Sequence, residues 1–485
     1  MKKMNLLAMS LVSAAALSFS SCSNNDDLTS GGGSNQSKVE SFYMTFAVQT
    51  PTSNGTRTQQ PTDANFKVAG TTAETKITSG TFYLVNEKTQ KTVFTKHITA
   101  SELNNAAPES PVVGTTTTKI EVPVQNVEEG VNYIVYFLAN TTDETPWTST
   151  YTAPTGFTGA YATDNNFVMF NQNDKNSHAD KYTVKFEAAN KEISHSAKVS
   201  ETIMLDRVTA RIDKPETEAT SITAKYPEGA DEKKKAAIDA EIAKVKTVTL
   251  SNYTITNLSN MTNIMQKWDE ATWTSLQIPT GTTHMQKSGD LGDQWTLQNY
   301  EWFAKADKNY VFENTATTPT TMYFEYKLGL DETKFTDTPD CTDGTFYRYN
   351  GNIYRSIAAI YAAYADQPVL FGGKTAEALK GELKITAEGK IGASPTELAK
   401  FRKDNVIEVF VEGKTYYSQV IIDKWLNANT IQRNTVYRLN VKNIYNLGAD
   451  VPNGKPDENK PMYYLDVEVS VNPWVLSTQD VNLGE

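Results

Sequence analysis

The sequence predicts a mainly β fold, built from two tandem β-sandwich domains with a few short helices that lie mostly in the second domain. Short apolar runs with a two-residue period recur along the chain, and this period is typical of half-buried strands. Segments rich in Asn, Gly, Asp and Pro separate the runs, and these residues favour turns. Roughly 440 residues follow a polar N-terminal stretch, which is enough for two or three domains of typical size.

The first residues predict a secretory signal peptide over residues 1–21, because a basic start precedes an apolar run and then small residues. The stretch Leu-Ser-Phe-Ser-Ser-Cys at 17–22 resembles a bacterial lipobox. This resemblance implies that Cys22 is acylated and becomes the mature N-terminus. The alternative is an ordinary cleaved signal peptide followed by an incidental cysteine. Residues 22–40, rich in Ser, Asn and Gly, are expected to form a lipidated flexible tether.

Charge, hydropathy and cysteine content narrow the classes of function. The formal net charge is −11 and is spread without a long acidic run, so we expect no basic face for nucleic acid. Beyond the signal peptide, no apolar run approaches the ~20 residues that span a bilayer as a helix. The chain has two cysteines, and acylation of Cys22 would leave Cys341 without an intramolecular disulfide partner.

In the first half, a strand within residues 41–57 precedes a sandwich domain expected over 58–205. Alternate residues of this first strand are apolar and point to one face. These residues are Phe42, Met44, Phe46 and Val48. Further strands of the first half are expected at 81–85, 118–122, 133–140, 167–170 and 182–186.

The strand pattern restarts near residue 205, so a second sandwich domain is expected over residues 206–447. Its strands are expected at 205–212, 246–250, 253–255, 321–326, 406–411 and 436–441. Two helices are expected at 233–245 and 351–365, because apolar residues recur there at helical spacing. The second helix carries an aromatic stripe, which favours core packing over a ligand-binding platform.

No recognisable catalytic or metal-binding motif is present, so we expect neither an enzyme nor a protein that binds a metal or cofactor. The isolated histidines are His97, His178, His195 and His284. A phosphate-binding loop, a nucleophile elbow and a zincin helix are all lacking. The Asp- and Asn-rich loop at 448–459 suggests calcium, but it lacks the ligand alternation of an EF-hand. Its prolines favour a flexible linker over 448–461.

The C-terminal segment, residues 462–485, contains a second alternating strand comparable with the first. Its expected apolar face consists of Leu465, Val467, Val469 and Val471, with Trp474 as a packing anchor. Burial of the four apolar side chains of the first strand is worth ~6–12 kcal/mol, at ~1.5–3 kcal/mol each. Removal of that strand would leave an apolar slot and an unpaired sheet edge, which another strand can fill.

Three stretches carry a resemblance to a known family. Residues 433–444, Arg-Asn-Thr-Val-Tyr-Arg-Leu-Asn-Val-Lys-Asn-Ile, match an R-N-x-x-Y strand, and residues 467–474 reproduce a V-x-V-x-P-W ending. Residues 207–212 look like an inter-domain segment of the same proteins. By these stretches the chain resembles the Bacteroidales fimbrillins, the subunits of type V pili, and most closely the major subunit of short fimbriae.

The resemblance implies a fold and a way of assembly. Members of this family are two transthyretin-like β-sandwiches and are exported as lipoproteins. An arginine-specific protease cuts after the first strand and removes the lipid with it, and the C-terminal strand of a neighbouring subunit then fills the groove. By position, the cleaved bond here joins Arg57 to Thr58. The alternatives are that Arg57 is an ordinary loop arginine and that the last strand is simply an edge strand.

We therefore expect a structural fimbrial subunit that begins as an outer-membrane lipoprotein and ends in extracellular fimbriae. The expected partners are other copies of the chain or related subunits, an Arg-specific surface protease, and the outer membrane through the lipid on Cys22. One alternative is a minor, tip or anchor subunit that acts as an adhesin. Another is an unpolymerised surface lipoprotein that binds glycans. The stalk role is favoured because no part of the chain is left over for an extra lectin-like domain.

Overall fold

Strands dominate the described part of the chain, and the predicted class of mainly β sandwiches with a few helices is confirmed. The structure is a computed structural model, and its described residues lie within one unit that extends from Glu40 to Glu485. The described residues are 40–49, 68–104, 115–141, 150–152, 161–173, 182–198, 200–269, 271, 275–285, 308–315, 317–367, 369–452 and 464–476.

The first sandwich is formed by eight strands in the order β4-β3-β6-β10-β12-β1-β5, with β11 paired to β6. These strands are β1 (Ser41–Gln49), β3 (Gly80–Asn86), β4 (Thr92–Ile98), β5 (Thr115–Pro123), β6 (Asn132–Ala139), β10 (Met169–Asn171), β11 (Thr183–Lys185) and β12 (Ser200–Arg207). The Phe46 ring on β1 lies 5.0 Å from the Phe82 ring on β3 and 5.5 Å from the Phe137 ring on β6. Because β1 is adjacent to neither β3 nor β6 in the sheet, these contacts join two layers around one apolar core.

The second sandwich packs a seven-stranded sheet against a three-stranded one. The larger sheet has the order β2-β29-β28-β13-β22, with β14 and β15 also paired to β28, and the smaller has the order β16-β23-β27. The larger sheet contains β2 (Val68–Gly70), β13 (Ala210–Asp213), β14 (Glu216–Thr217), β15 (Ile222–Thr223), β22 (Lys308–Val311), β28 (Thr435–Tyr445) and β29 (Tyr464–Leu476). The smaller contains β16 (Val245–Thr256), β23 (Thr321–Leu330) and β27 (Lys414–Val420). Ile212 and Leu439 from one sheet share a core with Tyr253 and Phe324 from the other.

Short strand pairs and six α-helices are also present in the described residues. Four strand pairs are β7 (Thr150–Thr152) with β18 (Met261–Asn263), β8 (Ala162–Thr163) with β9 (Asn166–Phe167), β17 (Leu258–Ser259) with β21 (His284–Met285), and β19 (Lys267–Trp268) with β20 (Leu276–Gln277). The α-helices are α1 (Thr72–Thr75), α2 (Ala100–Asn104), α3 (Glu232–Ile242), α4 (Ile357–Ala363), α5 (Ala376–Leu383) and α6 (Pro395–Asn405). None of these helices is long and apolar enough to cross a membrane.

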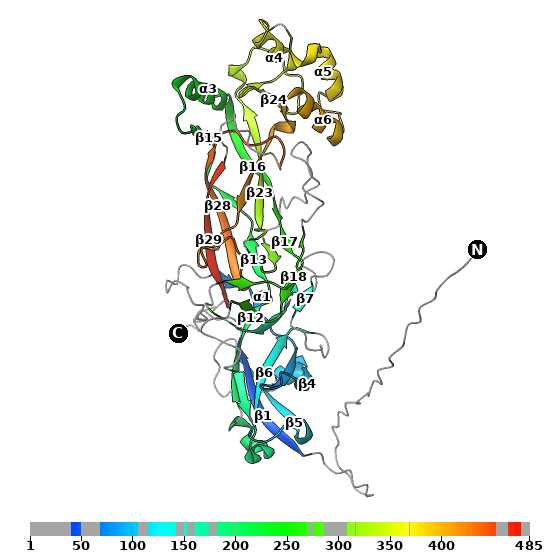
Figure 1. Ribbon diagram of the computed structural model, residues 1–485, viewed down its shortest axis with the longest axis vertical. Coiled ribbons are helices and arrows are strands. Elements are labelled where there is room, and N and C mark those ends of the chain that lie inside the picture. Colours follow the sequence, from blue (N-terminus) through cyan, green and yellow to red (C-terminus); the bar gives the residue numbers. More distant parts are fainter. Residues whose placement is uncertain are drawn as a thin grey trace, which may run out of the picture. The chain divides into compact units, whose positions relative to one another are not determined.

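Residues 331–413 form a module inserted between β23 and β27, two strands that pair with each other. The module contains helices α4, α5 and α6 beside a small sheet (Figure 1), whose strands are β24 (Phe346–Tyr349), β25 (Asn352–Tyr354) and β26 (Glu408–Phe410). A separate apolar core that includes Tyr347, Ile360, Leu383 and Phe401 holds these elements together. The sequence places these residues within the second sandwich domain and does not predict that they form an inserted helical module.

The structure corrects the ends of the predicted helices. The helix expected at 351–365 begins only at Ile357, where the Ser356 side chain accepts a hydrogen bond from the Ala359 N–H. Residues 352–354 of the predicted helix form β25 instead, because they pair with β24. Likewise, α3 ends at Ile242, and the chain enters β16 at Val245.

The structure also shortens the predicted linker at 448–461, because its first residues are packed. The backbone of Ala449 exchanges two hydrogen bonds with the backbone of Tyr416, at 2.9 and 3.1 Å. The Asp450 carboxylate accepts hydrogen bonds from the Val409 N–H, at 2.8 Å, and from the Arg402 guanidinium. The rest of the predicted linker, residues 453–461, is outside the described part of the chain.

Candidate functional site

Strand β1 occupies an interior position in the first sheet. It pairs antiparallel with β5 along its whole length, and parallel with β12 over residues 45–49. The sequence suggested that removal of this strand would expose one sheet edge. In the structure, removal would break hydrogen bonds to two strands and leave a gap with a strand on each side.

The structure brings the four apolar residues predicted on this strand into one core. The side chains of Phe42, Met44, Phe46 and Val48 are all 0% exposed. At the opposite end of β1 from Val48, the Phe42 ring lies 5.4 Å from the ring of Phe186. Because none of the four side chains keeps contact with solvent, the full ~6–12 kcal/mol estimate applies to their burial. They would leave behind a groove with an apolar floor.

The predicted cut lies between this strand and the rest of the chain. Strand β1 ends at Gln49 and β2 begins at Val68, so a break between Arg57 and Thr58 would sever the covalent connection of β1 to all later strands. Arg57 and Thr58 lie outside the described residues, and so does Cys22.

Strand β29, the predicted donor, lies at the edge of the second sheet. It pairs with β28 from Tyr464 to Pro473 (Figure 1), and on its other side β2 pairs with it only at residues 474–476. Leu465 and Val469 are buried, with 5% and 4% exposure, and Val467 is partly buried against the same core. For Val471 and Trp474, the structure describes the backbone pairing alone.

Two polar pairs hold β29 to its neighbour from the solvent side. The Lys442 ammonium lies 3.3 Å from the Glu468 carboxylate, and the Asn443 amide donates to Asp466 at 3.0 Å. Exposed pairs of this kind are worth about 0–1 kcal/mol each. Backbone hydrogen bonds and a few apolar side chains therefore provide most of what keeps β29 in its own sheet.

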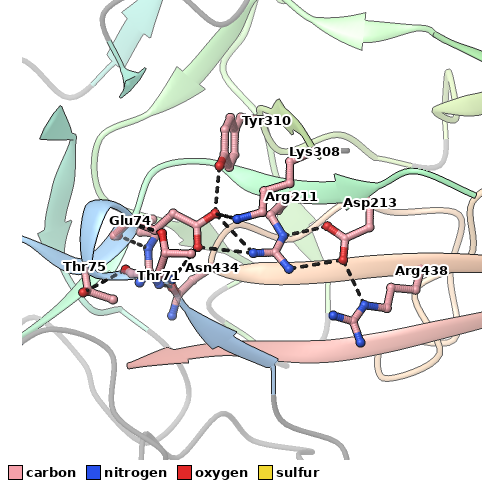
Figure 2. Close-up of polar contacts among 10 residues, drawn as sticks. Thr71, Glu74, Thr75, Arg211, Asp213, Lys308, Tyr310, Asn434 and Arg438 are labelled. Atoms are coloured by element: carbon pink, nitrogen blue, oxygen red, sulfur yellow. Dashed lines mark hydrogen bonds and ion pairs between the residues drawn. The ribbon is translucent and has the colours of Figure 1, made fainter. Parts of the chain in front are cut away.

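On the far side of the predicted cut, a buried charge cluster anchors the chain. Glu74 on α1 is 0% exposed, and its carboxylate accepts a hydrogen bond from the Thr71 N–H at 2.7 Å in a capping box. Lys308 and Tyr310 on β22 donate to the same carboxylate at 2.9 and 2.8 Å, and Arg211 on β13 donates at 3.2 Å (Figure 2). The segment that would follow a new N-terminus is thus tied to the second sheet.

The cluster controls the ionisation of Glu74. Burial opposes the charged form, but hydrogen bonds from Lys308, Thr71 and Tyr310 and the charge of Arg211 outweigh burial and lower the pKa of Glu74 to about 2. This value lies below the ordinary pKa of 4.5. The charge therefore stabilises the fold fully above about pH 4.5, and this contribution is lost as the pH falls toward 2.

We expect Glu74→Gln to lower the free energy of unfolding by roughly 3 kcal/mol at neutral pH, which corresponds to the pKa shift. The difference from the unchanged chain should shrink between about pH 4.5 and 2. Urea unfolding at a series of pH values measures it. Glu102→Gln is the matched control, because Glu102 also caps a short helix but its side chain is 37% exposed, and it should cost under about 1 kcal/mol. A loss of unfolding free energy in Glu74→Gln that does not vary with pH would contradict the prediction.

The same cluster explains two of the stretches that carried the family resemblance. The Arg207 guanidinium donates to the Glu74 carbonyl and to the Asn434 side chain, both at 2.8 Å, and Asn434 donates to Asp206 at 2.7 Å. The inter-domain segment and the R-N-x-x-Y strand therefore meet where the two sandwiches join. Sequence reasoning missed Glu74, although the capping-box spacing from Thr71 to Glu74 was a usable signal.

The other candidate sites do not assemble in the described residues. Among these residues, no group of three or more His, Cys, Asp or Glu side chains is placed to hold a metal ion. Asp450, in the loop considered for calcium, is ion-paired with Arg402. Cys341 is buried, and burial raises the pKa of its thiol to about 11, so the thiol is protonated at neutral pH.

Comparison with known proteins gives a family match to part of the chain. Residues 408–480 match the family described as major fimbrial subunit protein type IV, fimbrillin, C-terminal. A search of curated proteins gives no match. Among solved structures, the chain is similar to a candidate cell adhesion protein from Parabacteroides distasonis, with 15% identity, 91% of this chain and 100% of that chain covered, and a TM-score of 0.46.

Two further solved structures come from Porphyromonas gingivalis. One is a fimbrilin, with 15% identity, 91% of this chain and 100% of that chain covered, and a TM-score of 0.43. The other is the tip fimbrial protein Mfa3 with a C-terminal truncation, with 13% identity, 89% and 100% coverage, and a TM-score of 0.31. The family match thus lies in the C-terminal region of the chain, where residues 408–480 resemble the C-terminal part of fimbrillins, the family predicted from the sequence.

Proposed function

We propose that this chain is a structural fimbrial subunit that is cut after Arg57 and polymerises by donor-strand exchange. The observation that carries the proposal is the interior position of β1, whose apolar face is fully buried between β5 and β12. Cleavage of one peptide bond after this strand would free it from the rest of the chain. The pairings among the other strands of the sheet would not have to be broken. The fimbrillin match over 408–480 supports the fimbrial role.

Loss of β1 creates a site that favours a new strand. The edges of β5 and β12 would each expose unpaired N–H and C=O groups, which are costly to leave without partners in an apolar surrounding. The groove floor would expose the apolar core of the first sandwich. An extended segment with apolar residues at alternate positions satisfies both requirements at once.

The C-terminal strand meets the requirements for a donor. It lies at a sheet edge, and Leu465, Val467 and Val469 repeat at the two-residue spacing of the β1 face. Among its described side chains, departure of the strand costs the burial of Leu465 and Val469, at ~1.5–3 kcal/mol each, and uncovers Leu439 and Val441 in the second core, whereas the emptied groove offers four buried positions. Because 448–452 stay packed against β26 and β27, the chain would swing from a point beyond Pro452.

Lipidation and export complete the proposed sequence of events. A lipid on Cys22 would hold the precursor at the outer membrane, and several acyl chains anchor a protein much more firmly than one. Because Cys22 and β1 lie on the same side of Arg57, one cut would release both the anchor and the strand. The mature chain would then belong to an extracellular fibre, with other copies or related subunits as neighbours and an Arg-specific surface protease as the activating partner.

Treatment of the purified chain with an Arg-specific protease tests the proposal. Cleavage at Arg57 should produce ladders that resist SDS, because each groove holds a strand of its neighbour through a continuous backbone pairing. Arg57→Lys should remain uncut at this position and stay monomeric, with the same charge and nearly the same side-chain length. Monomer alone after complete cleavage of the unchanged chain and removal of the freed segment 1–57 would refute strand exchange.

A second candidate role, as an adhesin, is favoured by the inserted module at 331–413. The helices of the module pack in a core of their own, and β23 and β27 pair directly beside it, while Phe346, Ile353 and Phe410 of its small sheet pack into the core of the second sandwich. Its aromatic residues do not form a free platform, because the Tyr361 ring packs against Phe371 and the Tyr364 ring packs against Tyr349. Replacement of its helical part, residues 357–405, by a short turn keeps the small sheet and should leave ladder formation intact, and a loss of glycan or cell binding would assign adhesion to the helical part.

A further inference from the structure

The groove around β1 is shaped for large aromatic side chains at two positions four residues apart. The Phe46 ring lies against the rings of Phe82 and Phe137, at 5.0 and 5.5 Å. We call the space that Phe46 fills the first aromatic well. Gly80 helps to form it, because a Cβ at this position would lie 2.3 Å from the Phe137 ring. The well therefore depends on the Phe137 ring lying directly over Gly80.

A second aromatic well holds Phe42. The Phe42 ring lies 5.4 Å from the Phe186 ring, and the Lys191 ammonium lies 5.4 Å above the Phe42 ring as a cation–π contact. Lys191 pairs with Glu129 at 3.2 Å and with Glu40 at 3.6 Å, and only Glu129 stays with the cut chain, because Glu40 directly precedes β1. Both wells thus contain contacts that reward an aromatic ring beyond its buried area.

The chain's own C-terminal strand cannot fill both wells. The aromatic residues of 462–485 are Tyr463, Tyr464 and Trp474, and no two of them are four residues apart. In any register, at least one well would receive a smaller aliphatic or polar side chain. A buried phenylalanine that is replaced by a smaller side chain leaves a cavity, and such a change lowers affinity by about tenfold or more.

We propose that the emptied groove is a binding site for an extended peptide of the pattern Phe-x-Met-x-Phe-x-Val, and that it binds this peptide more tightly than the chain's own C-terminal strand. This inference rests on the proposed strand exchange. The excised β1 segment is then a competitor of assembly, and its release with the lipid anchor is required for the fibre to grow. A subunit that carried such a pattern in its tail would displace a copy of this chain from the groove.

Competition between peptides on the cleaved full-length chain tests the proposal. A fluorescent peptide of residues 40–49 is exchanged into the cut chain, and unlabelled peptides are added until its polarisation falls. The unlabelled 40–49 peptide should compete at concentrations at least about tenfold lower than the peptide of residues 462–471, which has equal length. A 40–49 peptide with Phe42→Val and Phe46→Val should lose about a hundredfold and approach the C-terminal peptide.

The outcomes separate this inference from the proposed function. If the 462–471 peptide binds as tightly as 40–49 or more tightly, strand exchange stands and the preference for aromatic residues is refuted. If neither peptide enters the cleaved chain while both remain soluble, no groove opens, and the proposed function fails together with the inference. The expected result also predicts that excess 40–49 peptide shortens the SDS-resistant ladders.

Discussion

A disulfide between β1 and β5 is expected to permit cleavage after Arg57 but to abolish polymerisation until it is reduced. Tyr43 and Glu121 are directly paired across the antiparallel strands, so Tyr43→Cys with Glu121→Cys falls within the usual Cα separation of a disulfide. Burial, and then the charge of the Glu121 carboxylate and its hydrogen bond with Tyr43, raise the pKa of Tyr43. Neither side chain belongs to the apolar row that fills the groove.

The cut but oxidised protein should remain monomeric in SDS without reductant, and addition of reductant should start ladder formation. The double variant and its control both carry Cys22→Ser, so that this cysteine cannot react. The buried, protonated Cys341 is a poor competitor for the new thiols. Tyr43→Cys alone is the matched control and should polymerise in both conditions. Ladders in the oxidised double variant would mean that polymerisation does not require β1 to leave its groove.

The two end strands could be predicted from the sequence because each is defined by its own two-residue period. The strand expected at 42–48 is β1 at Ser41–Gln49, and the alternating C-terminal run is β29. The partners of β1 could not be predicted, since β12 lies more than 150 residues later in the chain and pairs in parallel. Long-range pairing depends on the whole core, which local periodicity does not contain.

The errors in the predicted helix at 351–365 and the predicted linker at 448–461 have equally specific causes. Ile353 and Ile360 share helical spacing, but Ile353 belongs to a strand in the core of the second sandwich, whereas Ile360 belongs to the core of the inserted module. Asp450 looked like a linker residue because its partner Arg402 lies on a helix that the sequence analysis missed. That helix, α6, had a usable signal, since Ser394, Pro395 and Glu397 form a capping box with proline at the first turn.

The contacts of Glu74 could not be predicted from any local sequence pattern. Its carboxylate is bound by side chains from β13 and β22, which begin more than 130 residues after it. The sequence marks Glu74 only as a capping residue. Its burial, its low pKa and its position at the joint of the two sandwiches arise from tertiary packing alone.

Val467→Lys is expected to leave the cut chain folded but to abolish its polymerisation. In its own sheet Val467 is only partly buried, so a lysine there can extend its ammonium to solvent. In a neighbour's groove the corresponding position would match one of the four fully buried side chains of β1, where an unpaired ammonium costs several kcal/mol. A penalty of roughly 4 kcal/mol weakens exchange about a thousandfold.

Asp466→Lys provides the matched control, because it places the same lysine one position earlier, at an exposed residue on the opposite face of β29. We expect this variant to form ladders after cleavage, with a loss of stability under about 1 kcal/mol from the Asn443 contact. Thermal unfolding of both uncut variants checks that each is folded. Point variants are preferable to deletion of β29, since deletion would also uncover Leu439 and Val441 in the second core. Normal ladders from Val467→Lys would show that residues around 467 do not enter the groove, and the donor would then have to be sought elsewhere in 462–485.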